Sequence, residues 1–339
     1  MTRYNTFFSS GEQGLADQLL QLHADVSAYL AAEREAGRQL VFTKVFLSDI
    51  QNQQAVLESS SLFTDIIGRA AWSVVQQAPA NHSKAALLVR TEERPSFLKF
   101  DSLRLTEDEA RGKDSYEQTL LLFAKYIEKA GKAGLTLERH CVRTWIYVRD
   151  IDNNYASVVR ARNHVFEAHG LTAQTHFIAS TGIGGQSKTP NALVAMDFLT
   201  NPEATDTSLR YLHALDFLNY TQEYGVAFER GAMLTHEGHD TFFISGTASI
   251  DKKGQVLYEG DVRKQTERLL QNIEALLADG GSSLSDVLYF IVYLRDTADY
   301  ATVEAYMNRR FPHVPHIITH AYVCRPSWLI EMECMAEAH

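Results

Sequence analysis

One pattern of residues occurs three times in the chain and constrains its fold more than any other feature. Residues 42–49, 143–150 and 289–296 each form a run of β-branched and aromatic residues that ends in aspartate. A polar amphipathic stretch follows each run and closes on a phenylalanine: Phe63, Phe166 and Phe311. Repetition at domain-sized spacing predicts that the chain consists of three related structural units.

Helical patterns lie on both sides of each repeated run. Apolar residues recur at helical spacing in the segments that precede the three runs, residues 15–34, 116–130 and 262–278. After each run we expect a second helix and then an apolar strand, the strands lying at residues 85–89, 193–198 and 329–335. Strands that alternate with long amphipathic helices predict an α+β fold with helices on one face of each sheet.

The third unit is the most complete, and its pattern predicts the order β-β-α-β-α-β-β. We expect it to open with strands at residues 226–228 and 242–246. The second unit keeps most of this order, with an opening strand at residues 96–105, and the first unit is trimmed before its helix. The expected units are residues 1–92, 93–205 and 206–339, with linkers near residues 92–94 and 200–206.

The composition limits the functions that the chain can perform. The 339 residues are 45% hydrophobic and carry a formal net charge of −10, which argues against a nucleic-acid-binding surface rich in lysine and arginine. No segment approaches the ~20 apolar residues of a membrane-spanning helix, and the N-terminus lacks the apolar core of a signal peptide. Three cysteines without metal-binding spacing favour a reduced, cytoplasmic setting and indicate no metal site.

Motifs in the third unit resemble those of a known family. They lie at residues 224–230, 243–248, 254–256, 265–266, 292–296 and 330–333. On these motifs the unit is similar to the Rid superfamily, also called YjgF-like, whose members fold as chorismate-mutase-like α+β units and form trimers. Three such units in one chain resemble a trimer fused into a pseudo-trimer. This arrangement is similar to that of the chorismatases, Rid-like enzymes that split chorismate into pyruvate and a ring product. Residues 323–326 resemble the C-terminal signature of these enzymes.

Glu331 is the leading candidate for a catalytic residue. In the matching strand of the second unit, Ala195 occupies the same place, so the third unit keeps a carboxylate that the second lacks. A strand-borne glutamate in a partly closed cleft would have a raised pKa, which suits proton transfer near neutral pH. The resemblance implies that this residue moves a proton or activates water; a solvated or salt-bridged strand carboxylate is the alternative. Glu333 lies two residues after Glu331, so the two side chains point to the same face of the strand. We expect Glu333 at the rim of the cleft, because burial of two unpaired carboxylates would cost free energy.

Arg230 and Arg325 are the candidate ligands of a substrate carboxylate, because a guanidinium group binds a carboxylate through two parallel hydrogen bonds. Arg325 precedes Glu331 across a short turn. Arg230 belongs to the expected opening strand, which lines the cleft in Rid proteins, and Phe228 of the same strand is a further candidate for substrate contact. Surface ion pairs are the alternative for both arginines.

Two glycine-containing segments are expected to complete the cleft. Residues 180–185 are expected as a loop whose backbone amides could cradle an anion, with Ser180 or Thr181 donating hydrogen bonds; a plain glycine turn is the alternative. A segment of the third unit matches the Rid strand that lines the site, where glycine lets a ligand approach the main chain. Its candidate residues are Ser245, Gly246 and Thr247. His320 is a minor candidate.

One departure from the family concerns the deaminase reaction. Rid imine deaminases bind the substrate carboxylate with an arginine early in the penultimate strand, where this sequence has Ile317. The leading hypothesis is therefore a cofactor-independent enzyme that acts on a small unsaturated carboxylate, chorismate or a related compound, and releases pyruvate. A 2-imino acid deaminase and a non-catalytic metabolite-binding protein are the alternatives. The fused trimer is compatible with a monomeric chain, and the sequence leaves further pairing open.

Overall fold

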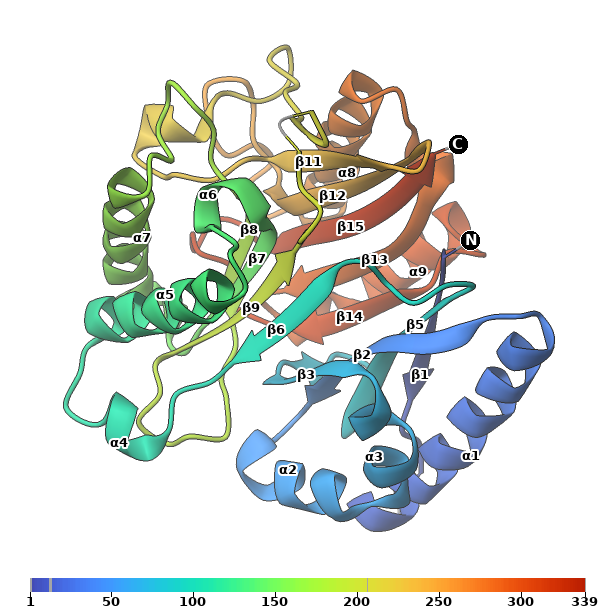
Figure 1. Ribbon diagram of the computed structural model, residues 1–339. Coiled ribbons are helices and arrows are strands. Elements are labelled where there is room, and N and C mark those ends of the chain that lie inside the picture. The colour runs from blue at the N-terminus through green and yellow to red at the C-terminus, as the bar shows by residue number, and fades with distance from the viewer. Residues whose placement is uncertain (1, 12–13, 206, 339) are drawn as a thin grey trace.

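Each of the three repeated runs lies within a separate β-sheet of the computed structural model, which describes residues 2–11, 14–205 and 207–338 (Figure 1). The runs form strands β2 (Gln39–Leu47), β7 (Cys141–Val148) and β13 (Val287–Leu294). Each pairs in parallel with the next long strand of its unit and antiparallel with the last strand. The predicted α+β fold with tandem Rid-like units is confirmed.

The first unit forms a four-stranded sheet in the order β1-β5-β2-β3. One strand precedes its first helix. The aspartate that ends the repeated run, Asp49, is the N-cap of helix α2 and accepts a hydrogen bond from the backbone N–H of Asn52. The remaining elements are β1 (Thr2–Phe8), α1 (Leu15–Glu35), α2 (Ile50–Ser59), α3 (Ser61–Asp65), η1 (Ile67–Arg69), β3 (Ala71–Gln76) and β5 (Ala85–Glu92).

The second unit forms a sheet in the order β6-β9-β7-β8. Its elements are β6 (Lys99–Leu103), α4 (Glu107–Ala110), α5 (Ser115–Lys132), α6 (Leu137–His140), α7 (Ile151–Ala168), β8 (Ala179–Gly184) and β9 (Val194–Thr200). The expectation of a glycine loop at residues 180–185 was wrong, since most of that segment is strand β8. Its glycines admit close neighbours: a Cβ atom at Gly182 would lie 2.8 Å from the ring of Tyr155.

The third unit forms a seven-stranded sheet in the order β10-β11-β12-β15-β13-β14-β4. Strand β4 (Ala78–Pro79) comes from the first unit and pairs with β14, so the units interlock at this edge. Asp206, at the expected boundary before this unit, lies outside the described residues. The other elements are β10 (Leu209–Tyr211), η2 (Thr221–Tyr224), β11 (Gly231–His236), β12 (His239–Ala248), α8 (Val262–Asp279), η3 (Leu284–Asp286), η4 (Thr297–Asp299), α9 (Tyr300–Arg310), β14 (His316–His320) and β15 (Ile330–Ala338).

The opening strand of the third unit lies later than predicted. Residues 226–228 form no strand, and the first long hairpin is β11–β12. The expected strand segment runs along the second unit instead: the N–H of Ala227 donates to Asn163 Oδ1 (3.3 Å), and the N–H of Glu229 donates to the carbonyl of Ile178 (3.1 Å). Contacts between units therefore override the local strand propensity of this segment.

The inner faces of the three sheets share one hydrophobic core. Phe46, Tyr147 and Tyr293 occupy equivalent places in the repeated runs, and all three are buried in this core. Figure 1 shows α1–α3 outside the first sheet and α5 and α7 outside the second. Because each inner face is covered by the other two sheets, the units are stabilised by one another. Among the described residues, no helix combines the length and the apolar composition needed to cross a membrane.

A buried carboxylate links the first and second units at this junction. Asp197 of β9 accepts hydrogen bonds from Arg104 Nη1 (2.9 Å), from the hydroxyl of Ser73 (2.6 Å) and from the hydroxyl of Tyr147 (2.9 Å). Arg104 also donates to Ser73 and to the carbonyl of Val74 in the first unit. The carboxylate is therefore fully satisfied although it has no exposed surface.

Asp197→Ala should lower the free energy of unfolding by about 3–5 kcal/mol, because it leaves the half-buried guanidinium of Arg104 and two buried hydroxyl groups without this acceptor. Urea denaturation measures this loss. Asp101→Ala is the matched control, since Asp101 pairs with the exposed Lys129 and should cost no more than about 1 kcal/mol. Equal losses in the two variants would contradict the role given to Asp197.

Candidate active site

A cavity of about 320 Å³ lies between the second and third units and contains the carboxyl group of Glu331. Helix α7 and strand β8 form its wall on the second unit. On the third unit its wall comes from residues 225–230, from strands β12 and β15, and from the segment that precedes β15. The side chains in the wall include Tyr155, Val159, Arg162, Ser180, Phe228, Arg230, Ile250, Cys324, Arg325, Trp328 and Glu331.

Strand pairing shows which residues of the other units are equivalent to Glu331. Glu331 pairs with Tyr293, and Ala195 of the second unit pairs with Tyr147, which holds the same place in the repeat. In the first unit, Ala86 pairs with Phe46 in the same way. Alanine therefore stands in two of the three equivalent places, and the third carries the carboxyl group.

The surroundings of Glu331 favour its neutral form. The side chain is 4% exposed, and no described residue donates a hydrogen bond to its carboxyl group. Burial, and then the negative charge of Glu333, raises the pKa of Glu331 to about 8. The carboxyl lies against the main chain of Gly246, where a Cβ atom would come within 1.9 Å of Glu331 Oε1. Only glycine leaves room for the acid in this position.

Glu333 does not lie at the rim of the cleft, as we expected, but has no exposed surface. Arg143 Nη2 donates to one carboxylate oxygen (3.0 Å) and Trp145 Nε1 to the other (2.7 Å). Burial alone would raise the pKa of Glu333, but the charges of Arg143 and Lys44 and hydrogen bonds from Thr181 and Trp145 outweigh it and hold the pKa below its ordinary value. The pairing that the sequence did not reveal is what allows this carboxylate to be buried.

Thr181 connects this ion pair to the candidate acid. Its hydroxyl oxygen accepts hydrogen bonds from Arg143 Nη2 (2.9 Å) and from the N–H of Gly246 (2.9 Å). The Gly246 peptide, against which Glu331 packs, is therefore fixed to the second unit. Thr181 is fully buried and does not line the cavity, so it is not the substrate donor that we expected.

Three guanidinium groups line the same cavity as Glu331. Arg230 donates from Nε to the carbonyl of Asn219 (3.0 Å) and from Nη2 to its side-chain oxygen (3.1 Å). The guanidinium carbons of Arg230 and Arg162 lie 5.9 and 5.7 Å from the ring centre of Phe228. The ring packs beside both cations in the cavity wall.

Arg325 is the third arginine of the cavity wall. It is half-buried, its guanidinium lies 4.7 Å from the ring centre of Trp328, and Nη1 donates to the carbonyl of Gly254 (3.3 Å). Planar guanidinium groups that are held against rings can bind carboxylates with two hydrogen bonds each. The cavity can therefore hold an anionic substrate beside a neutral carboxylic acid.

Sequence reasoning missed Arg162, although the sequence contained a signal for it. Arg162 is 1% exposed and lies on the buried face of α7 with Val158, Val165 and Phe166. A single arginine within the apolar stripe of a helix has to meet either a partner or a polar cavity. Tyr155, one turn before Val158 on the same helix, also reaches the cavity and was missed.

The remaining candidates from the sequence divide into two groups. Those that the structure brings to the cavity wall are Glu331, Arg230, Arg325, Phe228, Ser180 and Gly246. Ser245 and Thr247 do not reach it, because both side chains bond to the main chain. The Ser245 hydroxyl donates to the carbonyl of Glu229 (2.6 Å), and the Thr247 hydroxyl donates to the carbonyl of Ser245 (2.9 Å). His320 ends β14, faces the ring of Tyr322 and does not line the cavity.

Ile317 does not lie at the Glu331 cavity. The position at this cavity that is equivalent to the carboxylate-binding arginine of Rid deaminases therefore lies on another strand. Ile317 is fully buried in β14, which pairs with β4 of the first unit. The equivalent strand that faces the Glu331 cavity is β8. Pairing places Ile317 opposite Ile291 and Thr181 opposite Trp145, so Thr181 is the equivalent residue in β8. Neither position carries an arginine.

Comparisons with known proteins agree with this architecture. The family described as Endoribonuclease L-PSP matches residues 234–338. A RutC family protein of Pyrococcus abyssi (strain GE5 / Orsay) is 34% identical over 96 residues, which are 28% of this chain and 76% of that protein. The 3-aminoacrylate deaminase RutC of Acinetobacter baylyi (strain ATCC 33305 / BD413 / ADP1) is 30% identical over 96 residues, with the same coverage of 28% and 76%. The chain belongs to the Rid superfamily.

The whole chain resembles one solved structure in its fold. The crystal structure of a chorismatase matches with a TM-score of 0.69 and 20% sequence identity, covering 99% of this chain and 98% of that one. The Rid family match covers only the third unit, whereas this likeness extends over all three sheets. The predicted resemblance to chorismatases is thus confirmed at the level of the fold.

The stability of the protein should depend on pH through Glu331. Its folded pKa of about 8 exceeds the ordinary value of 4.5, so its contribution to stability is complete below pH 4.5 and is lost as pH rises through 8. Glu331→Gln removes this titration. The unfolding free energy of the variant relative to the native protein should therefore increase between these pH values, by up to about 1.4 kcal/mol per pH unit.

Denaturant unfolding at a series of pH values measures this difference. Glu337→Gln, at the less buried end of the same strand, is the control variant. A difference between native protein and Glu331→Gln that stays constant from pH 4.5 to 9 would show that the carboxyl is already ionised at neutral pH.

Proposed function

We propose that the protein is a cofactor-independent enzyme that releases pyruvate from chorismate or a related enolpyruvyl carboxylate. The observation that carries this proposal is a cavity lined both by a neutral carboxylic acid, Glu331, and by three arginines. The chorismatase-like fold of the whole chain supports it. Chorismate carries two carboxylates, which matches a surplus of arginine at the site.

In the proposed reaction, the arginines bind and orient the carboxylates of the substrate. Arg162 approaches from the second unit and Arg230 and Arg325 from the third, so both units have to be in place before the substrate is held. Binding at several fixed points converts the chemical step into one that is effectively unimolecular. Phe228 and Trp328 provide apolar surface beside the guanidinium groups.

Glu331 then acts as the general acid. Its proton passes to the methylene carbon of the enolpyruvyl group, which leaves an oxocarbenium ion and the Glu331 carboxylate. Water adds to the cation, the carboxylate accepts a proton from it, and the hemiketal collapses to pyruvate and a ring alcohol. An acid with a pKa of about 8 is protonated at neutral pH and becomes a competent base once it has given up its proton.

Incubation with chorismate and measurement of pyruvate test this proposal. We expect turnover that declines as pH rises above about 8, because the acid loses its proton. Glu331→Gln should lower kcat by about 10²–10⁴-fold, the usual contribution of general acid–base catalysis. Absence of pyruvate release above the level of this variant would remove the proposal.

The arginines should act through binding of the substrate. Lysine in place of Arg162, Arg230 or Arg325 keeps the charge but loses the two-pronged hydrogen bonding, and should raise KM by about 10–100-fold with a smaller effect on kcat. Arg160→Lys is the matched control, because Arg160 lies on the same helix as Arg162 but is exposed. Steady-state kinetics measure the change, and an unchanged KM in all three variants would contradict the role of the arginines.

Hydrolysis of 2-imino acids is the second candidate function. It is favoured by the similarity of the third unit to a 3-aminoacrylate deaminase. The isoleucine in β14 and the threonine in β8 speak against it, since neither can bind a carboxylate as the family arginine does. Trapping of amino-acid-derived imines with semicarbazide in the presence of the protein decides between the two reactions. Ligand-induced stabilisation without turnover in either assay would favour a metabolite-binding protein.

A further inference from the structure

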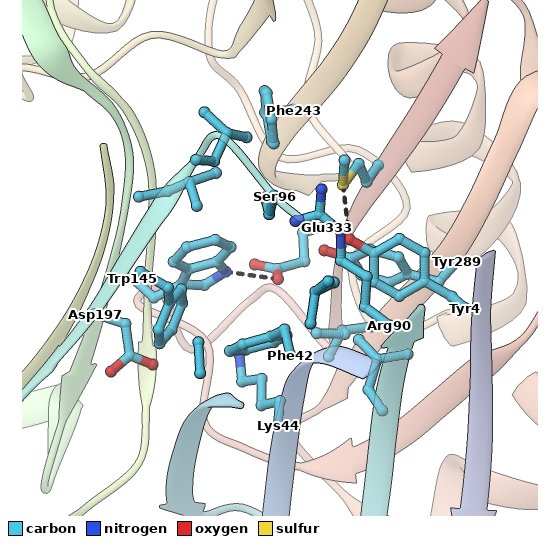
Figure 2. Close-up of a pocket in the computed structure, with 18 residues that line it drawn as sticks. Tyr4, Phe42, Lys44, Arg90, Ser96, Trp145, Asp197, Phe243, Tyr289 and Glu333 are labelled. Carbon is cyan, nitrogen blue, oxygen red and sulfur yellow. Dashed lines mark hydrogen bonds between the residues drawn. The ribbon is translucent and has the colours of Figure 1, made fainter. Parts of the chain in front are cut away.

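A second, smaller cavity lies where the three sheets meet, apart from the candidate active site (Figure 2). We call it the axial cavity; its volume is about 50 Å³. The first unit contributes Lys44 and Arg90, the second contributes Trp145, and the third contributes Glu333. Ser96, in the segment that joins the first and second units, also lines the cavity, as do Asp197, Tyr4 and Tyr289. Figure 2 shows the Arg90 guanidinium directed toward Ser96 and Glu333.

The charged groups around the axial cavity do not balance. Each of three carboxylates forms an ion pair with a different arginine, so each of these three pairs is electrically neutral. The pairs are Arg143–Glu333, Arg104–Asp197 and Arg90–Glu92. Lys44 is the fourth basic side chain of the group, and no carboxylate remains for it. With Lys44 protonated, the buried cluster carries one net positive charge.

The environment of Lys44 contains aromatic rings instead of an acceptor. The side chain is 4% exposed, and its amine lies 5.3, 5.5 and 5.1 Å from the ring centres of Phe46, Trp145 and Tyr147. Among the described residues, none forms a hydrogen bond or an ion pair with this amine. Rings stabilise a cation but do not neutralise it. Burial without a counter-charge lowers the pKa of Lys44, although the carboxylates of Glu333 and Asp197 act in the opposite direction.

Hydrogen-bond donors also exceed acceptors in this part of the molecule. Arg90 Nε and the hydroxyl of Ser96 are buried and have no partner among the described residues. Nε and Nη1 of Arg143, which does not line the cavity, are also buried without a hydrogen-bond partner among the described residues. Buried donors without acceptors are rare in folded proteins and cost free energy. The cluster therefore lacks an acceptor with negative charge.

We propose that the axial cavity is a binding site for a small monovalent anion, of the size of a halide, formate or acetate. Arg90 Nε and the Ser96 hydroxyl supply donors, and Lys44 supplies the charge that the protein leaves uncompensated. The neighbouring carboxylates do not exclude an anion, because each is already neutralised by its arginine. Since a cavity that holds benzene measures about 150 Å³, the volume suits an anion of a few atoms and excludes an aromatic acid.

Thermal unfolding in different sodium salts at constant ionic strength tests the site. Gluconate, which is too large for the cavity, serves as the reference anion, and formate, acetate and bromide are the probes. Tm should rise saturably with formate, by roughly 3–6 °C at one hundred times its dissociation constant. Benzoate should give no saturable rise.

Two variants separate this site from general salt effects. Lys44→Met keeps an unbranched apolar side chain beside the aromatic rings but removes the charge, and should abolish the formate-dependent rise in Tm. Ser96→Ala should weaken formate binding by about tenfold, the loss of one hydrogen bond to an anion, and also tests the site if the lysine variant does not fold. Lys84→Met, which changes an exposed lysine, is the control and should respond to formate as the native protein does.

Bromide soaked into crystals and located by anomalous diffraction gives the position of the ion. A peak in the axial cavity that is absent in Lys44→Met supports the proposal. Selective stabilisation by formate and acetate would assign the site to carboxylates, whereas stabilisation by bromide as well would assign it to small anions in general. Equal Tm shifts in all sodium salts, or shifts that persist in both Lys44→Met and Ser96→Ala, would overturn the proposal. These outcomes do not depend on whether the protein releases pyruvate.

Discussion

The buried ion pair between Glu333 and Arg143 is the interaction on which the rest of the site depends. It joins β15 of the third unit to β7 of the second and has almost no contact with solvent. Thr181 extends it to the Gly246 peptide, and that peptide forms the surface on which Glu331 rests. Removal of either charge would leave the other buried without a partner, which proteins tolerate poorly. The position of the candidate acid is thus coupled to the contact between units.

Two carboxylates on one face of one strand are held in opposite protonation states by their surroundings. Glu333 is paired with a guanidinium group and stays ionised, whereas burial and the negative charge of Glu333 keep Glu331 neutral. Separation of two acids in this way is how protein sites obtain a neutral acid near pH 7. In the other two units alanine, Ala86 or Ala195, stands in the equivalent place.

Much of the fold and part of the site could be predicted from the sequence. The threefold repetition identified the sheets. Strand pairing supports the prediction that Ala195 and Glu331 hold equivalent positions in their units. Predictions failed where a contact between units decides the structure. Residues 226–228 lie outside the sheet and bond with the second unit, and Gly182 of β8 makes room for Tyr155. Thr181 and Ser245 were assigned to substrate but join β8 to β12, and Thr247 bonds to the main chain of its own strand.

The sequence by itself determined the repeat, the family and the position at which the third unit carries an acid and the second an alanine, because periodicity and motif residues are local properties of the chain. Only the tertiary structure decided that Arg162 joins Arg230 at the cavity, that Glu333 is paired inside and that Lys44 is left without a counter-charge. These facts concern distances between units. Electrostatic energies depend on such distances and on burial, and neither is encoded in the spacing of residues along the chain.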